Sequence, residues 1–420
     1  MLPLGVLAAS GAAAVKYFIT KVTGASSSST GNGVFIDSSD NILWAFSEGA
    51  SPYYSQYTTL DRTITYGTST RWTNSTGSPR IWSIRKTATS TYLVTFPDNL
   101  SSSSEILKTN SSGTKQWSRS FTLSGTSGGE IALDSSENIY LVTKASQTAT
   151  GNNKFTVAKY NSSGTIQWQK AIQGESNCNG WAIAVTPSGD VYAGGSLSSN
   201  TTPQLNVMKL NTSGTKQWAL WIANGGYQIQ QLVTDSDGNC FIMWNDGTYT
   251  YVSKANSSGT HQWTRRLTVG NGYDMAIDPS NNLYVIAGSY TAAHYVFKYN
   301  SSGTIQWQRS IVSSSGFMYG LQGVSKIFAN DKSVIWTLQE TGNADPVLFK
   351  FPVDGTLTGT YAMGGYNYTW AASSITETSA SFTWYDFTAY YSANSGSATD
   401  AAGSVSPSTW TPTTTTKEIP

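Results

Sequence analysis

Charged residues are scarce in this chain. Lys and Arg total 25, Asp and Glu total 24, and together they make up 12% of the 420 residues, which leaves a net charge of +1. Such a balance gives no general attraction to nucleic acid or to an anionic membrane. No apolar run approaches the ~20 residues that a membrane-spanning helix needs. We therefore expect neither a nucleic-acid partner nor a membrane span.

Metal-binding side chains are equally few. The chain has two cysteines, Cys178 and Cys240, and two histidines, His261 and His294. No C-x-x-C pair occurs, so a zinc framework is absent. Alignment on the repeat described below puts Cys240 at the buried start of a strand and Cys178 in a connecting loop. We predict that the two cysteines are not bonded to each other.

No pattern of catalytic residues stands out. Asp235, Asp237 and Asn239 in DSDGN resemble the opening of a calcium loop, but no Glu closes the twelve-residue pattern, and a hairpin turn is favoured. The two histidines, His261 and His294, look like ordinary strand residues and show no arrangement with a Ser and an Asp. We predict no catalytic, cofactor-binding or metal-binding residues, no cofactor, and no enzymatic activity.

Repetition, by contrast, is abundant. Five nearly identical octets end in Trp at spacings of 51, 50, 45 and 44 residues, which is typical of a repeat architecture. They are NSSGTKQW at Trp117, NSSGTIQW at Trp168, NTSGTKQW at Trp218, NSSGTHQW at Trp263 and NSSGTIQW at Trp307.

A second element, a polar turn followed by a dense apolar run, recurs eight times at 43 to 52 residues. Its central positions are Leu43, Tyr92, Tyr140, Tyr192, Phe241, Tyr284, Ile335 and Phe382. One unit reads as four short antiparallel strands, which cannot bury both faces without neighbouring units. The sequence predicts an all-β, eight-bladed β-propeller with four antiparallel strands per blade; seven blades is the alternative.

The two ends of the chain fit a closed ring. Thr114 lies 26 residues before Tyr140 and Thr215 lies 26 before Phe241, and the same count back from Leu43 gives Tyr17. We predict that the strand at 15–22 completes the last blade, built from residues 366–396. The expected domains are an apolar docking peptide at 1–14, the propeller at 15–396, and an extended Ser/Thr/Pro-rich tail at 397–420 anchored by Trp410.

The octets resemble the tryptophan-docking repeat of quinoprotein-type propellers, in which a turn Gly precedes a Trp by four residues. The matching pairs are Gly113 and Trp117, Gly164 and Trp168, Gly214 and Trp218, Gly259 and Trp263, and Gly303 and Trp307. The resemblance implies packing between blades. The adjacent cysteines of the quinone-dependent members are missing here, so it implies no quinone.

Two features of the repeat have competing interpretations. The Asn-Ser-Ser and Asn-Thr-Ser triplets match a glycosylation pattern, but their constant place favours hairpin turns.

A lysine recurs two residues before each turn, and a ring of lysines suits an anionic ligand. We favour instead a stem packed on the blade with its ammonium in water. These lysines are Lys108, Lys159, Lys209, Lys254, Lys298 and Lys350.

The apolar start of the chain bears on function. A cleaved signal peptide would suit its A-x-A-like end, but no Lys or Arg precedes it, and we expect it to be retained. The opening LPLGVLAASG, followed by such repeats, resembles tail-associated structural proteins of marine bacteriophages.

This resemblance implies a non-enzymatic structural or adhesive virion protein, bound to other tail proteins through its N-terminal peptide and C-terminal tail. Such a protein presents its propeller to a host glycan or protein. The alternative is a secreted bacterial cell-surface propeller that binds glycans or proteins.

Overall fold

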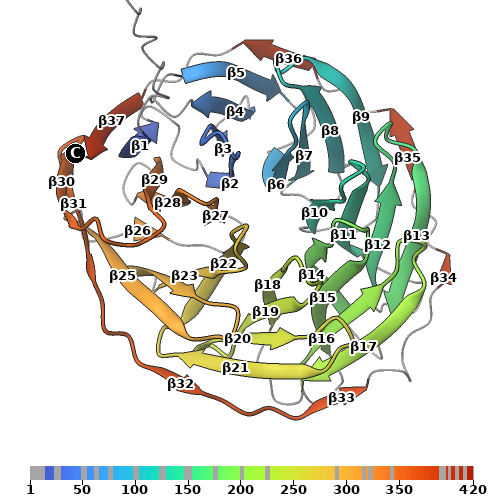
Figure 1. The fold of residues 1–420 in the computed structure, drawn as a ribbon. Coiled ribbons are helices and arrows are strands. Elements are labelled where there is room, and N and C mark those ends of the chain that lie inside the picture. Colours follow the sequence, from blue (N-terminus) through green and yellow to red (C-terminus); the bar gives the residue numbers. More distant parts are fainter. Residues whose placement is uncertain are drawn as a thin grey trace, which may run out of the picture.

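The structure is a closed ring of antiparallel sheets (Figure 1). The computed structural model describes residues 15–22, 30–48, 54–60, 66–73, 79–97, 104–122, 129–145, 154–173, 178–198, 203–222, 228–288, 293–314, 318–319, 325–340, 345–386, 394–395, 399–402, 406–409 and 414–419. The strands in these ranges form seven sheets, which surround a central axis as the blades of a propeller. The same ranges contain no helix long and apolar enough to cross a bilayer.

Each blade contains four strands that run from the axis to the rim. Blade 1 has β2 (Thr30–Ile36), β3 (Ile42–Glu48), β4 (Tyr54–Leu60) and β5 (Tyr66–Thr73). Blade 2 has β6 (Pro79–Lys86), β7 (Ser90–Pro97), β8 (Ser104–Asn110) and β9 (Lys115–Thr122). Blade 3 has β10 (Gly129–Leu133), β11 (Ile139–Ala145), β12 (Lys154–Tyr160) and β13 (Ile166–Gln173). Blade 4 has β14 (Cys178–Val185), β15 (Val191–Ser198), β16 (Pro203–Leu210) and β17 (Lys216–Ile222).

The remaining blades follow the same plan. Blade 5 has β18 (Gln228–Thr234), β19 (Cys240–Asn245), β20 (Thr250–Ala255) and β21 (His261–Leu267). Blade 6 has β22 (Asn271–Ile277), β23 (Leu283–Gly288), β24 (His294–Tyr299) and β25 (Ile305–Ser313). Blade 7 has β27 (Ile327–Ala329), β28 (Ser333–Glu340), β29 (Pro346–Pro352) and β1 (Tyr17–Val22), with β26 (Met318–Tyr319) paired to the far end of β28.

The predicted count of eight blades is wrong, because the described strands build seven sheets. The first seven central positions, from Leu43 to Ile335, do lie in the second strands of the blades. Phe382, the eighth, lies outside any blade's four strands and packs edge-on against Trp244 and Tyr251 of blade 5. Its apolar run reflects packing on a blade's rim, a role that spacing alone does not distinguish from a blade strand.

The N-terminal strand closes the ring, but in a different blade from the predicted one. β1 pairs antiparallel with β29, with Phe18 opposite Lys350. Residues 327–352 therefore form the blade that it completes, and residues 366–396 do not. Both Phe18 and Ile19 are fully buried, so the closure is packed as tightly as the blades around it.

The most unusual element is a belt that adds one more strand to the outer edge of every blade. It runs around the ring against the order of the blades, from blade 6 down to blade 1 and on to blade 7 (Figure 1). Its strands are β31 (Tyr366–Ala372), β32 (Glu377–Ser379), β33 (Trp384–Asp386), β34 (Asn394–Ser395), β35 (Thr399–Ala402), β36 (Ser406–Thr409) and β37 (Thr414–Ile419). A further strand, β30 (Gly359–Met363), forms a hairpin with β31.

The belt covers the outer edge strand of each blade. An outer strand without a neighbour presents free N–H and C=O groups that invite pairing with another chain. Here each outer strand of the ring is hydrogen-bonded to a belt strand. The expected boundary between propeller and tail at 396–397 falls inside the belt, because β35, β36 and β37 pair with blades 2, 1 and 7. Trp410 lies outside the described residues.

Neighbouring blades meet through the tryptophans of the octets, as the resemblance implied. Each indole lies against a turn glycine of the next blade, whose φ is positive. The pairs are Trp117 with Gly164, Trp168 with Gly214, Trp218 with Gly259, Trp263 with Gly303, and Trp307 with Gly355. The indole N–H of Trp307 also donates to the carbonyl of Val353 at 3.0 Å. Glycine is needed here for both its backbone angle and the space it leaves.

Gly303→Ala should destabilise the protein by roughly 3 kcal/mol, as the sum of left-handed backbone strain and overpacking. A Cβ at Gly303, where φ is +75°, would lie 2.7 Å from the Trp263 ring. The matched control is Gly365→Ala, because Gly365 has φ +85° but nothing within 4 Å of the added carbon. That control should cost only about 1 kcal/mol. Urea denaturation of both variants tests this, and equal losses would contradict the role assigned to the indole.

The cysteine prediction is confirmed. Cys240 is a free, buried thiol at the start of β19, so it is not bonded to Cys178. Cys178 itself begins β14 and does not lie in a connecting loop. Burial raises the pKa of the Cys240 thiol, and the charge of Asp235 acts in the same direction. The thiol is therefore neutral and unreactive in the folded protein.

Candidate functional site

A β-bulge recurs at one position in the innermost strands of the ring. Five innermost strands shift register at the same place, at Gly33, Ser83, Ala182, Gln231 and Asp274. Bulges of this kind redirect a side chain out of the regular pleat. The equivalent position, four residues before the turn, is Glu130 in blade 3 and Lys326 in blade 7. These seven residues are called the axial ring below.

The polar members of the axial ring are joined in one chain of contacts. Arg85, two residues beyond Ser83, contacts Glu130 at 2.9 Å. The Gln231 amide donates to Glu130 at 3.2 Å and also to Asp274, and Asp274 pairs with Lys326 at 3.8 Å.

The contact between Gln231 of blade 5 and Glu130 of blade 3 passes over blade 4. It is possible because the axial-ring residue of blade 4, Ala182, is small. Two cations and two carboxylates thus balance one another around the axis.

Both buried carboxylates are fully engaged. Glu130 also accepts the backbone N–H of Ile183, and Asp274 accepts that of Ile327 at 2.9 Å. Burial raises the pKa of Asp274, although Lys326 and Gln231 oppose the rise. A carboxylate this deep needs partners to remain charged. The chain of contacts supplies them, so the ring forms a fixed polar floor across the axis.

A well opens from this floor towards the face formed by the turns between first and second strands. It has a volume of about 540 Å³, and Ile84, Ile183, Leu232 and Met275 contribute apolar walls. It continues into a wider vestibule of about 760 Å³, which the turn residues surround. Volumes of this size are typical of small-molecule sites.

Two phenylalanines stand where the well meets the vestibule. Phe35 comes from blade 1 and Phe328 from blade 7, and their ring centroids are 4.7 Å apart. Both side chains line the well and the vestibule, and both are only partly buried. An aromatic pair left partly exposed inside a concavity offers apolar surface to a ligand.

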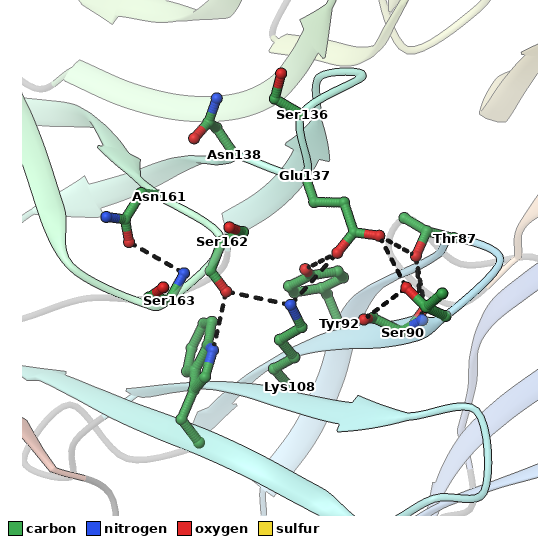
Figure 2. A network of polar contacts seen from close by, with 12 residues as sticks. Thr87, Ser90, Tyr92, Lys108, Ser136, Glu137, Asn138, Asn161, Ser162 and Ser163 are labelled. Atoms are coloured by element: carbon green, nitrogen blue, oxygen red, sulfur yellow. Dashed lines mark hydrogen bonds and ion pairs between the residues drawn. The ribbon is translucent and has the colours of Figure 1, made fainter.

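The turns around the vestibule are held by contacts between blades, and Glu137 provides the clearest example (Figure 2). Its carboxylate accepts hydrogen bonds from the hydroxyls of Thr87 and Tyr92 at 2.6 Å, and Lys108 pairs with it at 3.3 Å. All three partners belong to blade 2, whereas Glu137 belongs to the first turn of blade 3. Glu137 holds a positive φ of 59°, a strain that these contacts offset.

Acid should weaken this contact between blades. Partial burial tends to raise the pKa of Glu137, but hydrogen bonds from Thr87, Tyr92 and Lys108 outweigh it and hold the pKa at about 2, below an ordinary value of 4.5. Because the folded-state pKa is depressed, its stabilising contribution is present above pH 4.5 and is lost as the pH falls towards 2. The melting temperature of the wild type should therefore fall more steeply over that window than that of Glu137→Gln. Parallel slopes would show that Glu137 does not carry the effect.

The lysine ring is structural, and its ammonium groups are not simply left in water. Each of five lysines donates to a turn carbonyl of the next blade: Lys108 to Ser162, Lys159 to Thr212, Lys209 to Ser257, Lys254 to Ser301 and Lys298 to Val353. Lys350 is buried against Asp40 of blade 1. Figure 2 shows Lys108 between Glu137 and Ser162. The lysine ammonium groups that an anionic ligand would require are therefore already engaged within the protein.

The other candidate residues serve as turn and strand positions. The Asp235 carboxylate accepts the backbone N–H groups of Asp237 and Asn239 at 3.1 and 2.8 Å, which confirms the hairpin turn. His261 begins β21 and His294 begins β24. Within the described ranges no three His, Cys, Asp or Glu side chains are grouped so as to hold a metal ion.

Sequence reasoning missed the axial ring. Its signal is present, because the residue four positions before each turn varies between Gly, Ser, Glu, Ala, Gln, Asp and Lys. A charged or amide side chain inside an otherwise apolar inner strand is the informative observation. The repeat has to be aligned on its turns before these positions fall into one column.

Comparisons with known proteins add the fold but no family. No protein-family model matches the chain, and no curated protein matches its sequence. Among solved structures, the polysaccharide lyase Uly1 has a TM-score of 0.51 at 8% identity, over 77% of this chain and 90% of its own. The Dos1 propeller has a TM-score of 0.46 at 9% identity, over 80% and 94%.

A quinohemoprotein alcohol dehydrogenase, ADHIIG from Pseudomonas putida HK5, has a TM-score of 0.47 at 10% identity, over 77% of this chain and 66% of its own. At 8% identity, the likeness to Uly1 bears on the fold alone. Two of these three structures are enzymes by name, and nothing in the three bears on the expected likeness to phage tail proteins.

Proposed function

We propose that this chain is a non-enzymatic recognition protein of a virus particle, associated with a bacteriophage tail or fibre. It binds its target in the well and vestibule. One observation carries the proposal: a well of about 540 Å³ opens at the centre of one face above a floor whose charges are already paired. A floor built in this way orients a ligand, and its acids and bases are engaged with one another and not free for chemistry.

Attachment to the particle is assigned to residues 1–14. The belt strands near the C-terminus pair with the blades of the ring, so they are engaged within the molecule. The apolar N-terminal residues lie outside the described ranges and precede in the sequence β1, the fourth strand of blade 7 (Figure 1). Removing residues 1–14 should leave a folded propeller that no longer joins the particle.

Two measurements test these assignments. Mass spectrometry of purified particles and of the culture medium should find the chain, with its first fourteen residues, in the particle fraction. Binding to host cells should be lost in Ser39→Trp, because Ser39 is exposed and lines the vestibule, where an indole would fill the space. The matched control is Ser302→Trp, at an exposed outer turn, which should bind normally.

The outcomes separate two locations for the protein. A processed chain found only in the medium, with binding still blocked by Ser39→Trp, would favour the secreted cell-surface propeller. Binding that survives Ser39→Trp would remove the vestibule from either function.

A further inference from the structure

The charges and surfaces of the well and vestibule indicate which chemical class of ligand binds there. This step rests on the proposed function. The floor carries Arg85 and Lys326 as cations, and Glu130 and Asp274 as carboxylates, in contact with one another through Gln231. Their charges sum to zero. A ligand that reaches this floor meets both donors and acceptors but no net field, which disfavours ions of either sign.

The rim disfavours anionic ligands in particular. Lys86 lies 3.6 Å from Asp37, so this cation is paired with an acid at the mouth. Asp331, an exposed residue, also lines the vestibule and adds negative charge. An anionic ligand would meet these carboxylates on entry. Exposed Ser38 and Ser39 supply neutral hydroxyls beside them.

The walls combine apolar and polar surface in close proximity. Phe35 and Phe328 present ring surface at the neck, with an angle of 50° between their planes. The Asn281 amide is held at the rim by its hydrogen bond to Ser236 at 2.8 Å. A sugar ring has an apolar face and hydroxyls that both donate and accept hydrogen bonds. It therefore matches an aromatic pair that lies between two polar zones.

We propose that the well and vestibule bind a neutral carbohydrate. A sugar ring packs on Phe35 and Phe328, and its hydroxyls reach the charge-balanced floor on one side and the rim amide and hydroxyls on the other. The vestibule volume of about 760 Å³ exceeds the requirement of a single sugar, so a short oligosaccharide is the fitting occupant.

Calorimetric titration tests the proposal with named probes. Maltotriose, cellotriose and chitotriose are the neutral sugars, trigalacturonate is the anionic comparison and trilysine the cationic one. At least one neutral trisaccharide should bind more tightly than both charged probes. Phe328→Leu, which keeps apolar bulk but removes the aromatic ring, should weaken that binding tenfold or more with an unchanged melting temperature.

The matched control is Tyr249→Leu. Tyr249 is a partly buried aromatic in the turn between β19 and β20, at the end of blade 5 away from the vestibule. It should leave sugar binding unchanged. Tighter binding of trilysine would assign the phenylalanine pair to a cationic ligand and overturn the carbohydrate assignment. Failure of all three neutral sugars at millimolar concentration would also overturn it.

These failures differ from a failure of the proposed function. If no neutral sugar binds but Ser39→Trp still abolishes binding to host cells, the vestibule is a recognition site for another ligand. If sugars bind equally to the wild type and to Ser39→Trp, the sugar site lies elsewhere and this inference is wrong.

Discussion

Truncation after Ala372 is expected to lower the free energy of unfolding by more than about 5 kcal/mol, a large share of the total for a folded domain. It removes the belt strands of six blades, β32 to β37. β37 alone pairs with β1 at six positions and places Ile419 in the core beside Ile19. Each lost ladder hydrogen bond contributes roughly 0.5–1.5 kcal/mol. Thermal denaturation and the soluble yield measure the effect.

Rescue in trans distinguishes the role of the belt from general damage. A separately expressed segment of residues 373–420 should restore solubility and part of the melting temperature, because the strand edges that it covers remain in place. A scrambled segment of the same composition is the control. A truncated protein that stays soluble and melts like the full chain would show that the belt is dispensable.

Trp307→Ala should destabilise the ring by roughly 3 kcal/mol, near the lower end for a large aromatic because the indole is only partly buried. The ring of Trp307 contacts Gly355 of blade 7 and lies edge-on to Tyr284 at 6.1 Å between centroids. Its removal would empty the space between two blades and leave the Val353 carbonyl without its indole donor. Equilibrium denaturation in urea provides the measurement.

Trp307→Phe separates the two contributions of the indole. It keeps an aromatic ring near Gly355 but removes the N–H donor, so its loss should be about 1 kcal/mol, the usual contribution of one hydrogen bond. If Trp307→Phe proves as damaging as Trp307→Ala, the hydrogen bond carries the stability and the packing argument is wrong.

The architecture of the blades was predictable from the sequence because each blade repeats the same physical solution. An aromatic residue in the second strand and the Trp of the octet recur together in five units, since their rings pack edge-on, as those of Tyr284 and Trp307 do at 6.1 Å. The register of Tyr17 correctly indicated a strand that closes a blade. Such patterns are visible in the sequence because the strands of each blade and the packing between blades require the same residue types at the same positions.

The belt was not predictable by the same reasoning. β34 has two residues and β32 three, too short for any alternation to appear. The ring determines which outer strand each belt strand pairs with. Ser and Thr can pair with an outer strand as well as most residues can, so the belt sequence shows no distinctive pattern. The run around Phe382 was apolar and evenly spaced, so periodicity assigned it to an eighth blade. Tertiary context overrode spacing there.

The belt also has a consequence for synthesis. β1 emerges from the ribosome first, yet its two neighbours are β29 and β37, near the other end of the chain. At a translation rate of ~10 residues per second, the first strand waits roughly half a minute for either partner. The apolar residues Phe18 and Ile19 remain uncovered during that interval, which is the condition that recruits chaperones. Closure of this ring is therefore a late step of folding, and its yield depends on how well the cell shields one short strand.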